Sequence, residues 1–190
     1  MAAPRIIVAI TGGSGAPYAL RLLESLPTRP DLILSDAGRQ VVEYETGRTA
    51  AALEKMARKV YSNSDLAAAP ASGSHKYDAL VIIPCSTTTL SKIAVGIGDN
   101  LVTRAAQVCL KERRKVIIVP RETPLSQVHL EQMAKLAQMG VIVLMAAPPW
   151  YIRPKSLEDF QNYMAGKVMD HLGIDHKLFP RWKQEDESRD

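Results

Sequence analysis

The chain has 190 residues, of which 46% are hydrophobic, 23% charged and 5% aromatic, and its formal net charge is +4. This length suits one domain with a substantial core. The modest charge is not gathered in one arm and few aromatic side chains accompany it, which disfavours a nucleic-acid partner. No apolar run is long enough to span a bilayer and no secretory signal is evident, so we expect a cytoplasmic protein without a membrane partner. The two cysteines, Cys85 and Cys109, fit a reducing compartment as packed thiols.

Apolar runs alternate with helical patterns along the chain. Strands are predicted over Arg5–Ile10, Leu32–Ser35, Ala79–Pro84, Val116–Val119 and Val141–Leu144. Helices are predicted over Ala16–Leu26, Ala37–Thr46, Thr49–Val60, Thr89–Val95, Leu101–Arg113, Leu125–Met139 and Ser156–Leu172. This alternation predicts an α/β fold, a single domain with an open, doubly wound and mostly parallel sheet. We assign residues 1–175 to this domain, and expect residues 176–190 to form a tail that contacts a neighbouring subunit or is disordered.

The first strand ends in the most informative loop, Thr11-Gly12-Gly13-Ser14-Gly15. Its small residues expose backbone N–H groups where the next helix begins, an arrangement that favours an anion such as a phosphate. A dinucleotide fingerprint would need glycine at the position of Tyr18, and a P-loop would end in Gly-Lys-Ser/Thr, so neither is supported. The alternative is an ordinary tight turn between strand and helix.

Two further strands end in polar loops. The third predicted strand leads into Ser86-Thr87-Thr88-Thr89, and the fourth into Pro120-Arg121-Glu122-Thr123-Pro124. Because parallel strands end at the same edge of a sheet, the three loops should converge on a ligand. The hydroxyl run could instead be a helix cap, and Arg121-Glu122 a surface ion pair of little energetic value.

Two other features allow more than one interpretation. The irregular stretch Ala67–Ser74 is either a simple connector, which the sequence favours, or a mobile flap over a site. Trp150 could belong to the core, to a subunit interface or to a site. The histidines lack metal-ligand spacing, so we expect no metal, and His129 is interpreted as structural.

Together these loops resemble the flavin prenyltransferases of the UbiX type. The matching segments follow the family order over nearly the whole chain. They include Thr11–Ala16, Ser35, Glu45-Thr46, Ala71–Ser74, Pro84–Ser91, Asp99–Leu101, Arg104–Ala106, Leu110–Arg114, Pro120–Pro124, His129-Leu130, Tyr151, Arg153-Pro154 and Ser156–Asp159.

The resemblance implies a Rossmann-like flavoprotein fold and a prenyltransferase activity. Such an enzyme joins the dimethylallyl group of dimethylallyl monophosphate to N5 and C6 of reduced FMN, releases phosphate and needs no metal. The family assembles as homododecamers with sites shared between subunits. The prenylated FMN passes to a partner decarboxylase of the UbiD type.

The resemblance also implies residue roles. The residues implied to bind FMN are Gly12, Gly13, Ser14, Ser35, Ser86, Thr87, Thr88, Thr89 and Arg121. Those implied to grip the donor phosphate are Lys111, Arg121, Tyr151 and Lys167. Those implied to take part in catalysis are Ser14, Glu45, Glu122 and Lys111, and those implied to lie near the site at subunit contacts are Arg104 and Trp182.

Lys167 departs from the family, which usually has arginine at this position. Lysine keeps the charge and loses the bidentate fork, so the donor could bind more weakly or differ. A solvated face of the last helix is the alternative interpretation of Lys167. The final proton acceptor is either Glu122 or the released phosphate.

Two other functions stay open. A flavin-dependent cysteine decarboxylase would share the fold, but it would carry Pro-Ala-Ser-Ala-Asn-Thr where this chain has Pro84-Cys85-Ser86-Thr87-Thr88-Thr89. A non-catalytic FMN carrier for a partner decarboxylase would bind flavin without turning over a donor.

Overall fold

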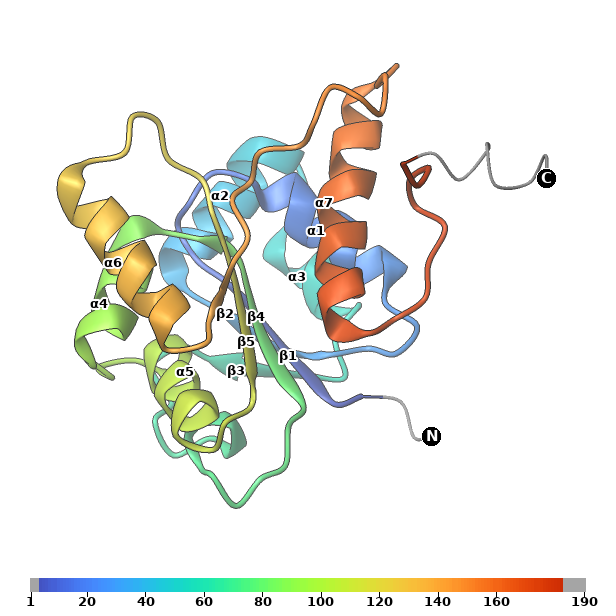
Figure 1. The fold of residues 1–190 in the computed structure, drawn as a ribbon. Helices are drawn as coiled ribbons and strands as arrows, with labels where there is room; N and C mark the ends of the chain where they lie inside the picture. The colour runs from blue at the N-terminus through green and yellow to red at the C-terminus, as the bar shows by residue number, and fades with distance from the viewer. Residues whose placement is uncertain (1–3, 183–190) are drawn as a thin grey trace.

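Strands and helices alternate along the chain in the computed structural model, which describes residues 4–182 (Figure 1). The strands are β1 (Ile6–Ile10), β2 (Asp31–Leu34), β3 (Lys59–Ser62), β4 (Ala79–Cys85), β5 (Lys115–Pro120) and β6 (Ile142–Val143). The helices are α1 (Ala16–Ser25), α2 (Asp36–Thr46), α3 (Ala50–Glu54), α4 (Thr87–Val95), α5 (Leu101–Lys111), α6 (Gln127–Gln138) and α7 (Leu157–Leu172), with a short 3-10 turn η1 (Ala69–Ala71).

All strand pairs in the sheet are parallel, and the spatial order is β3-β2-β1-β4-β5-β6. The order reverses between β1 and β4, which is the switch point of a doubly wound fold. The predicted fold class is therefore confirmed. The loops that follow β1 and β4 lie side by side at the edge where the strands end, because Thr11 Oγ1 donates to the Pro84 carbonyl at 2.9 Å.

The sheet is covered on both faces, so its central strands are apolar on both sides. Helices α1, α2, α3 and α7 pack on one face with Ile6, Val8 and Ile10 of β1. Helices α4, α5 and α6 pack on the other face with Ile7 and Ala9 of the same strand. Figure 1 shows the two helical layers on either side of the strands.

The predicted helix over Thr49–Val60 is wrong beyond its first turns. Helix α3 ends at Glu54, and Lys59–Ser62 form the edge strand β3, which pairs with β2 alone. The alanine-rich start of the segment carries a strong helical preference that hid the short strand. Only Tyr61 of this strand is buried, so the alternation that marks a half-buried strand is weak.

The stretch Ala67–Ser74 is an anchored connector. Its residues Ala68, Pro70 and Ala71 are buried, and η1 packs against α5. Arg104 Nε donates to the Ala71 carbonyl at 3.3 Å, and Arg114 donates to the Gly73 carbonyl at 2.7 Å. These bonds support the connector interpretation over the flap.

Cys85 and Cys109 are buried free thiols, as predicted. Burial raises the pKa of Cys85 to about 12 and that of Cys109 to about 11, so both thiols stay neutral at physiological pH. Within residues 4–182, none of the helices combines the length and apolar composition needed to cross a bilayer.

Candidate active site at the switch point

Ser14, Glu45 and Arg121 come together around one cavity of about 310 Å³ at the carboxyl edge of the sheet. Ser14 belongs to the loop after β1, Glu45 to α2, and Arg121 to the loop after β5. The rest of the wall comes from α1 and α7 and is partly apolar: Gly15, Pro17, Tyr18, Leu157, Phe160 and Gln161. The predicted convergence of the first and third polar loops is confirmed by this cavity.

Glu45 holds the start of α1. Its Oε2 accepts hydrogen bonds from the backbone N–H groups of Gly15 at 2.9 Å and Ala16 at 2.8 Å. At these two amides, the Glu45 carboxylate is therefore the anion that was expected at the N-terminus of α1. The Glu45 charge and burial together raise the pKa of Tyr18, with burial as the larger cause, so this wall residue stays a neutral phenol.

Two glycines allow the loop after β1 to take its path. Gly15 has φ +120°, a backbone conformation that L side chains rarely adopt. A β-carbon on Gly13 would lie 3.3 Å from backbone atoms of Cys85 and Ser86, tighter than most real contacts. The loops after β1 and β4 therefore approach each other backbone to backbone.

At this edge, several backbone N–H groups have no hydrogen-bond acceptor within the described part of the chain. Within the described part of the chain, Thr11, Gly15, Ala16, Ser86 and Thr89 use their N–H groups in hydrogen bonds to protein acceptors. The N–H groups of Gly12–Ser14, Thr87 and Thr88 have no such acceptor among residues 4–182. This leaves donors on both loops at the switch point for an anionic or carbonyl-bearing ligand.

Ser35 and Ser86 are helix caps. Ser35 Oγ accepts from Gly38 N–H at 3.0 Å at the start of α2, and Ser86 Oγ accepts from Thr89 N–H at 3.2 Å at the start of α4. Ser86 Oγ also donates to Thr89 Oγ1 at 3.0 Å. The capping alternative for the hydroxyl run therefore holds for Ser86, whose oxygen is already engaged.

Replacing Ser86 by alanine should lower the free energy of unfolding by about 1 kcal/mol, because the N–H of Thr89 then loses its side-chain acceptor. Urea unfolding of S86A measures this loss. Ser91 lies inside the same helix, so S91A is the matched control and should not destabilise. Equal stability of the two variants would contradict the capping role.

Thr87 and Thr88 face a different cavity. They line a space of about 330 Å³ between α4 and α6, together with Lys92, His129 and Gln132. His129 Nδ1 accepts from Ser126 N–H at 3.3 Å in a capping box, which supports its structural interpretation. The structure thus places the side chains of Thr87 and Thr88 along a cavity that is separate from Ser14 and Arg121, while their N–H groups stay at the switch point.

Arg121 and Glu122 do not pair with each other among the described residues. Arg121 is exposed along the cavity, and its guanidinium has no carboxylate within salt-bridge distance in residues 4–182. Glu122 Oε1 accepts from Thr123 N–H at 3.1 Å. The surface ion-pair alternative is therefore wrong for this pair, and the Arg121 charge is available to a ligand.

Tyr151, Lys167 and Trp182 gather on one side of α7. The Tyr151 ring meets Trp182 edge-on with centroids 5.1 Å apart, and meets Tyr163 with centroids 6.3 Å apart. Tyr163 and Lys167 lie one turn apart on the same helix face. Lys167 Nζ is 3.5 Å from Asp170 Oδ2, so the ion pair within the helix accounts for part of its position.

The described part of the C-terminal tail packs on its own chain. Asp170 accepts two bonds of 2.7 Å from Arg181 and lies 3.1 Å from the buried ring of His176. Phe179 lies against Tyr163 with centroids 4.7 Å apart. Contact with a neighbouring subunit stays a prediction, and residues 183–190 lie outside the described residues.

Asp170 should make stability depend on acid pH. Hydrogen bonding from Arg181, with the nearby His176, lowers the pKa of Asp170 to about 2, below the value of about 3.9 expected in the unfolded chain. Its stabilisation is therefore present above about pH 4 and is lost as the pH falls toward 2.

We expect D170N to lower the free energy of unfolding at pH 7 by about 1–2 kcal/mol, discounted for partial exposure. It should also flatten the fall in stability between pH 4 and pH 2. Urea unfolding across this pH range is the measurement, with Glu131→Gln at an exposed position of α6 as the matched control. If the unfolding free energy of D170N fell between pH 4 and pH 2 as steeply as that of the wild type, Asp170 would not be the source of this pH dependence.

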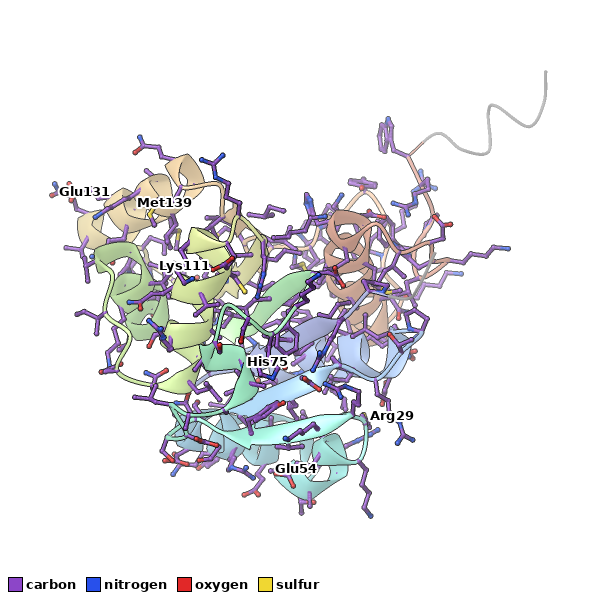
Figure 2. The ribbon with its side chains drawn as sticks, turned by 90° about the horizontal axis from the view of Figure 1, so that it is seen from below. Arg29, Glu54, His75, Lys111, Glu131 and Met139 are labelled. Carbon is purple, nitrogen blue, oxygen red and sulfur yellow. The ribbon has the colours of Figure 1, made fainter. Side chains whose placement is uncertain are left out.

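Lys111 and Arg104 do not reach the cavity within one chain. Lys111 ends α5 at the amino edge of the sheet, where its ammonium pairs with Glu112. Figure 2 views the molecule from below and labels Lys111 on this edge. Arg104 is half-buried and bonded to the Ala71 carbonyl. A single chain therefore does not assemble the four-residue phosphate grip that the resemblance implies.

The α1 and α7 walls of the cavity are not evident from the sequence patterns. In the sequence, Tyr18 is notable only because a dinucleotide fingerprint would have glycine at its position. It lies in the first turn of α1, however, and this places it beside the loop. Phe160 and Gln161 come from a helix that begins 36 residues after Arg121, at Leu157. Trp150 is 78% exposed and meets Phe160 edge-on at 5.3 Å, so the core is wrong among its three interpretations, and a subunit interface or a site stays open.

Comparison with known proteins places the chain in a family. The Flavoprotein family model matches residues 1–168. Flavin prenyltransferase UbiX of Methanocaldococcus jannaschii is 46% identical over 180 residues, covering 94% of this chain and 98% of the relative.

Two solved structures agree with this relationship. AnUbiX (PadA1) in complex with FMN and dimethylallyl pyrophosphate has a TM-score of 0.92 and 35% identity, covering 95% of this chain and 98% of its own. The dodecameric FMN-dependent UbiX-like decarboxylase from Escherichia coli O157:H7 has a TM-score of 0.90 and 38% identity, covering 94% and 98%. The chain therefore belongs to the UbiX-type flavin prenyltransferases within the flavoprotein family.

Proposed function

We propose that this protein is a flavin prenyltransferase. It joins the dimethylallyl group of dimethylallyl monophosphate to N5 and C6 of reduced FMN and releases phosphate. The observation that carries the proposal is the meeting of Ser14, Glu45 and Arg121 at one cavity beside the switch point of the sheet. Ligands of doubly wound sheets bind at this place.

The residues at the switch point fit FMN. The open N–H groups of Gly12–Ser14 and of Thr87 and Thr88 suit its phosphate and its ring carbonyls. Gly13 leaves room where a β-carbon would touch the loop after β4. Ser35 keeps its hydroxyl proton for donation, because its oxygen acts as the acceptor in the cap, whereas the Ser86 hydroxyl already donates to Thr89 Oγ1. When bound, reduced FMN supplies the electron-rich ring that takes the prenyl group.

Arg121 would stabilise the leaving group. When the allylic C–O bond of the donor breaks, its electron pair goes to the phosphate, and negative charge grows on the phosphate oxygens. Arg121 lines the cavity without an ion-pair partner in the described chain, so its fork is free for two of those oxygens. Preorganised charge of this kind commonly contributes more to rate acceleration than any other single effect.

The remaining cavity residues have distinct proposed roles. Tyr18, Leu157 and Phe160 form an apolar wall that would hold the dimethylallyl chain and exclude water. Ser14 would lie beside the reacting edge of the flavin, and Glu45 fixes the junction of the loop and α1 by accepting from the amides of Gly15 and Ala16. A proton leaves at the end of the reaction, and Glu122 Oε2 or the released phosphate would accept it.

The proposal includes a homo-oligomer. A relative is dodecameric, and Lys111 lies at the opposite edge of the sheet from Arg121, so a second copy would bring Lys111 to the donor phosphate. Arg104 and Trp182 would lie near such subunit contacts, while Tyr151 and Lys167 would complete the phosphate grip. A UbiD-type decarboxylase would receive the product, and the buried free thiols suit a reducing, cytoplasmic location.

Anaerobic incubation of the protein with reduced FMN and dimethylallyl monophosphate tests the function. We expect the extracted flavin to be heavier by one C5 prenyl unit in mass spectrometry, with one phosphate released per flavin. The pyrophosphate donor, bound by a relative, is run in parallel to set donor specificity. Flavin that binds but stays unmodified with both donors would support the carrier alternative, and CO₂ release from a cysteine substrate would support the decarboxylase.

A further inference from the structure

The chain turns back after α7, and the tail segment 174–182 runs beside this helix (Figure 1). Gly173 ends α7 with φ 73°, a left-handed conformation that favours glycine and reverses the chain. The tail segment packs closely, because a β-carbon on Gly166 would lie 2.6 Å from ring atoms of His176 and of Phe179. The segment therefore depends on a glycine inside α7 to lie this close to the helix.

Asp170 is the group on α7 that holds the tail segment. Arg181 donates one hydrogen bond of 2.7 Å to each of its carboxylate oxygens. The Nδ1 of His176 accepts from Leu178 N–H at 3.2 Å, so a neutral ring carries its proton on Nε2, which lies 3.1 Å from Asp170 Oδ1. Lys167 Nζ is farther away, 3.5 Å from Oδ2. The tail segment thus makes the stronger contacts with the carboxylate, and Lys167 makes the weakest.

Lys167 lies on the side of α7 that leads to the candidate active site. It follows Phe160 of the cavity wall by seven residues, so the two share one stripe of the helix, about 10 Å apart along its axis. One turn before Lys167, Tyr163 meets the ring of Tyr151. Within residues 4–182, Asp170 is the one carboxylate within salt-bridge distance of Lys167. The strength of that pair therefore decides how much of the Lys167 charge an anion beside Tyr151 can use.

We propose that Arg181 is a positioning residue for donor binding, because it occupies Asp170 and so leaves the Lys167 ammonium to the donor phosphate. The inference rests on the proposed function, in which Lys167 belongs to the phosphate grip. Two cations share one carboxylate here, so one positive charge is left over. Arginine binds the carboxylate with its planar fork, whereas lysine is a point charge that can turn to another anion. Without Arg181, Asp170 becomes the full counterion of Lys167, and the group keeps no net charge for a phosphate.

Calorimetric titration of dimethylallyl monophosphate into the protein loaded with oxidised FMN tests this role. Oxidised FMN lacks the electron-rich ring that takes the prenyl group, so binding is measured without turnover. R181Q should bind the donor about fivefold more weakly than wild type, because the released Asp170 carboxylate pairs with Lys167. K177Q, which removes a charge from an exposed position of the same tail segment, is the matched control and should bind as wild type does.

Removing the carboxylate as well should reverse the effect. D170N/R181Q should return to the wild-type affinity, and D170N alone should bind the donor at least as tightly as wild type, because Lys167 then has no counterion on α7. Thermal unfolding should show that D170N/R181Q is no more stable than R181Q. A residue that only stabilised the fold would give the opposite order of affinities, since each lost contact would weaken binding further.

A double-mutant cycle shows whether the effect passes through Lys167. In a K167A background, R181Q should weaken donor binding no further, because the ammonium that Arg181 leaves available is absent. Equal donor affinities of R181Q and wild type would overturn the inference and leave the proposed function standing. A D170N/R181Q variant that binds as weakly as R181Q would also overturn it, and would show that the tail segment acts through the contact of Trp182 with Tyr151. A wild type that does not bind the donor would overturn the proposed function together with the inference.

Discussion

Replacing Arg121 by glutamine should slow prenyl transfer by about two to three orders of magnitude and leave the fold intact. Arg121 is exposed, lines the cavity and makes no ion pair in the described part of the chain, so its loss breaks no ion pair of the described fold. The whole effect should therefore fall on the charge that develops on the leaving phosphate. Single-turnover prenylation, followed by the flavin mass, measures it.

The matched control for this prediction is R48Q, which removes an exposed arginine that pairs with Glu24 and is not among the residues lining the cavity. It should transfer the prenyl group at the wild-type rate. If R121Q and R48Q had equal rates at saturating donor, Arg121 would have no part in the chemical step. A change confined to the apparent donor affinity of R121Q would reduce its role to binding.

Glu45 should prove to have two separable roles. Glu45→Ala removes the acceptor of two amides at the start of α1, so we expect a loss of stability of about 1–2 kcal/mol and a loss of activity. Glu45→Gln keeps an oxygen that accepts both N–H groups and loses only the charge. We expect it to be nearly as stable as wild type and to transfer the prenyl group about a hundredfold more slowly.

Thermal unfolding and single-turnover rates, measured together on both variants, check this separation. The exposed Glu43 on the same helix gives the matched control E43Q, which should change neither quantity. Wild-type activity in E45Q would leave Glu45 a purely structural residue that holds the loop. A loss of stability in E45Q equal to that in E45A would show that the charge, rather than the acceptor, holds α1.

The overall fold could be predicted because its signals are local. The apolar runs of β1, β4 and β5 are buried on both faces, and their periodicity differs clearly from that of the intervening helices. Strand β3 could not be predicted, because it is an edge strand with one buried residue behind an alanine-rich helix. Asp31 lies outside the predicted second strand, since its burial depends on Arg58 and Tyr77, which are distant in sequence.

Part of the site could also be predicted from local sequence signals. The loops after β1 and β5 converge because parallel strands share an edge, which the sequence pattern already implies. Two contacts depended on tertiary geometry: the bonds from Gly15 and Ala16 to Glu45, and the wall formed by Phe160. The position of Lys111 at the far edge follows from the direction of α5, but a resemblance in sequence does not say which copy supplies the residue.

We expect Arg121 and Lys111 to serve one reaction centre from two copies of the chain. Mixed oligomers made by coexpressing the separately impaired variants K111A and R121Q, with different affinity tags, test it directly. Sites that combine an intact Arg121 with an intact Lys111 should form in roughly a quarter of positions, with a matching return of prenyl transfer. Doubly purified mixed oligomers that stay as inactive as either parent would contradict a shared site.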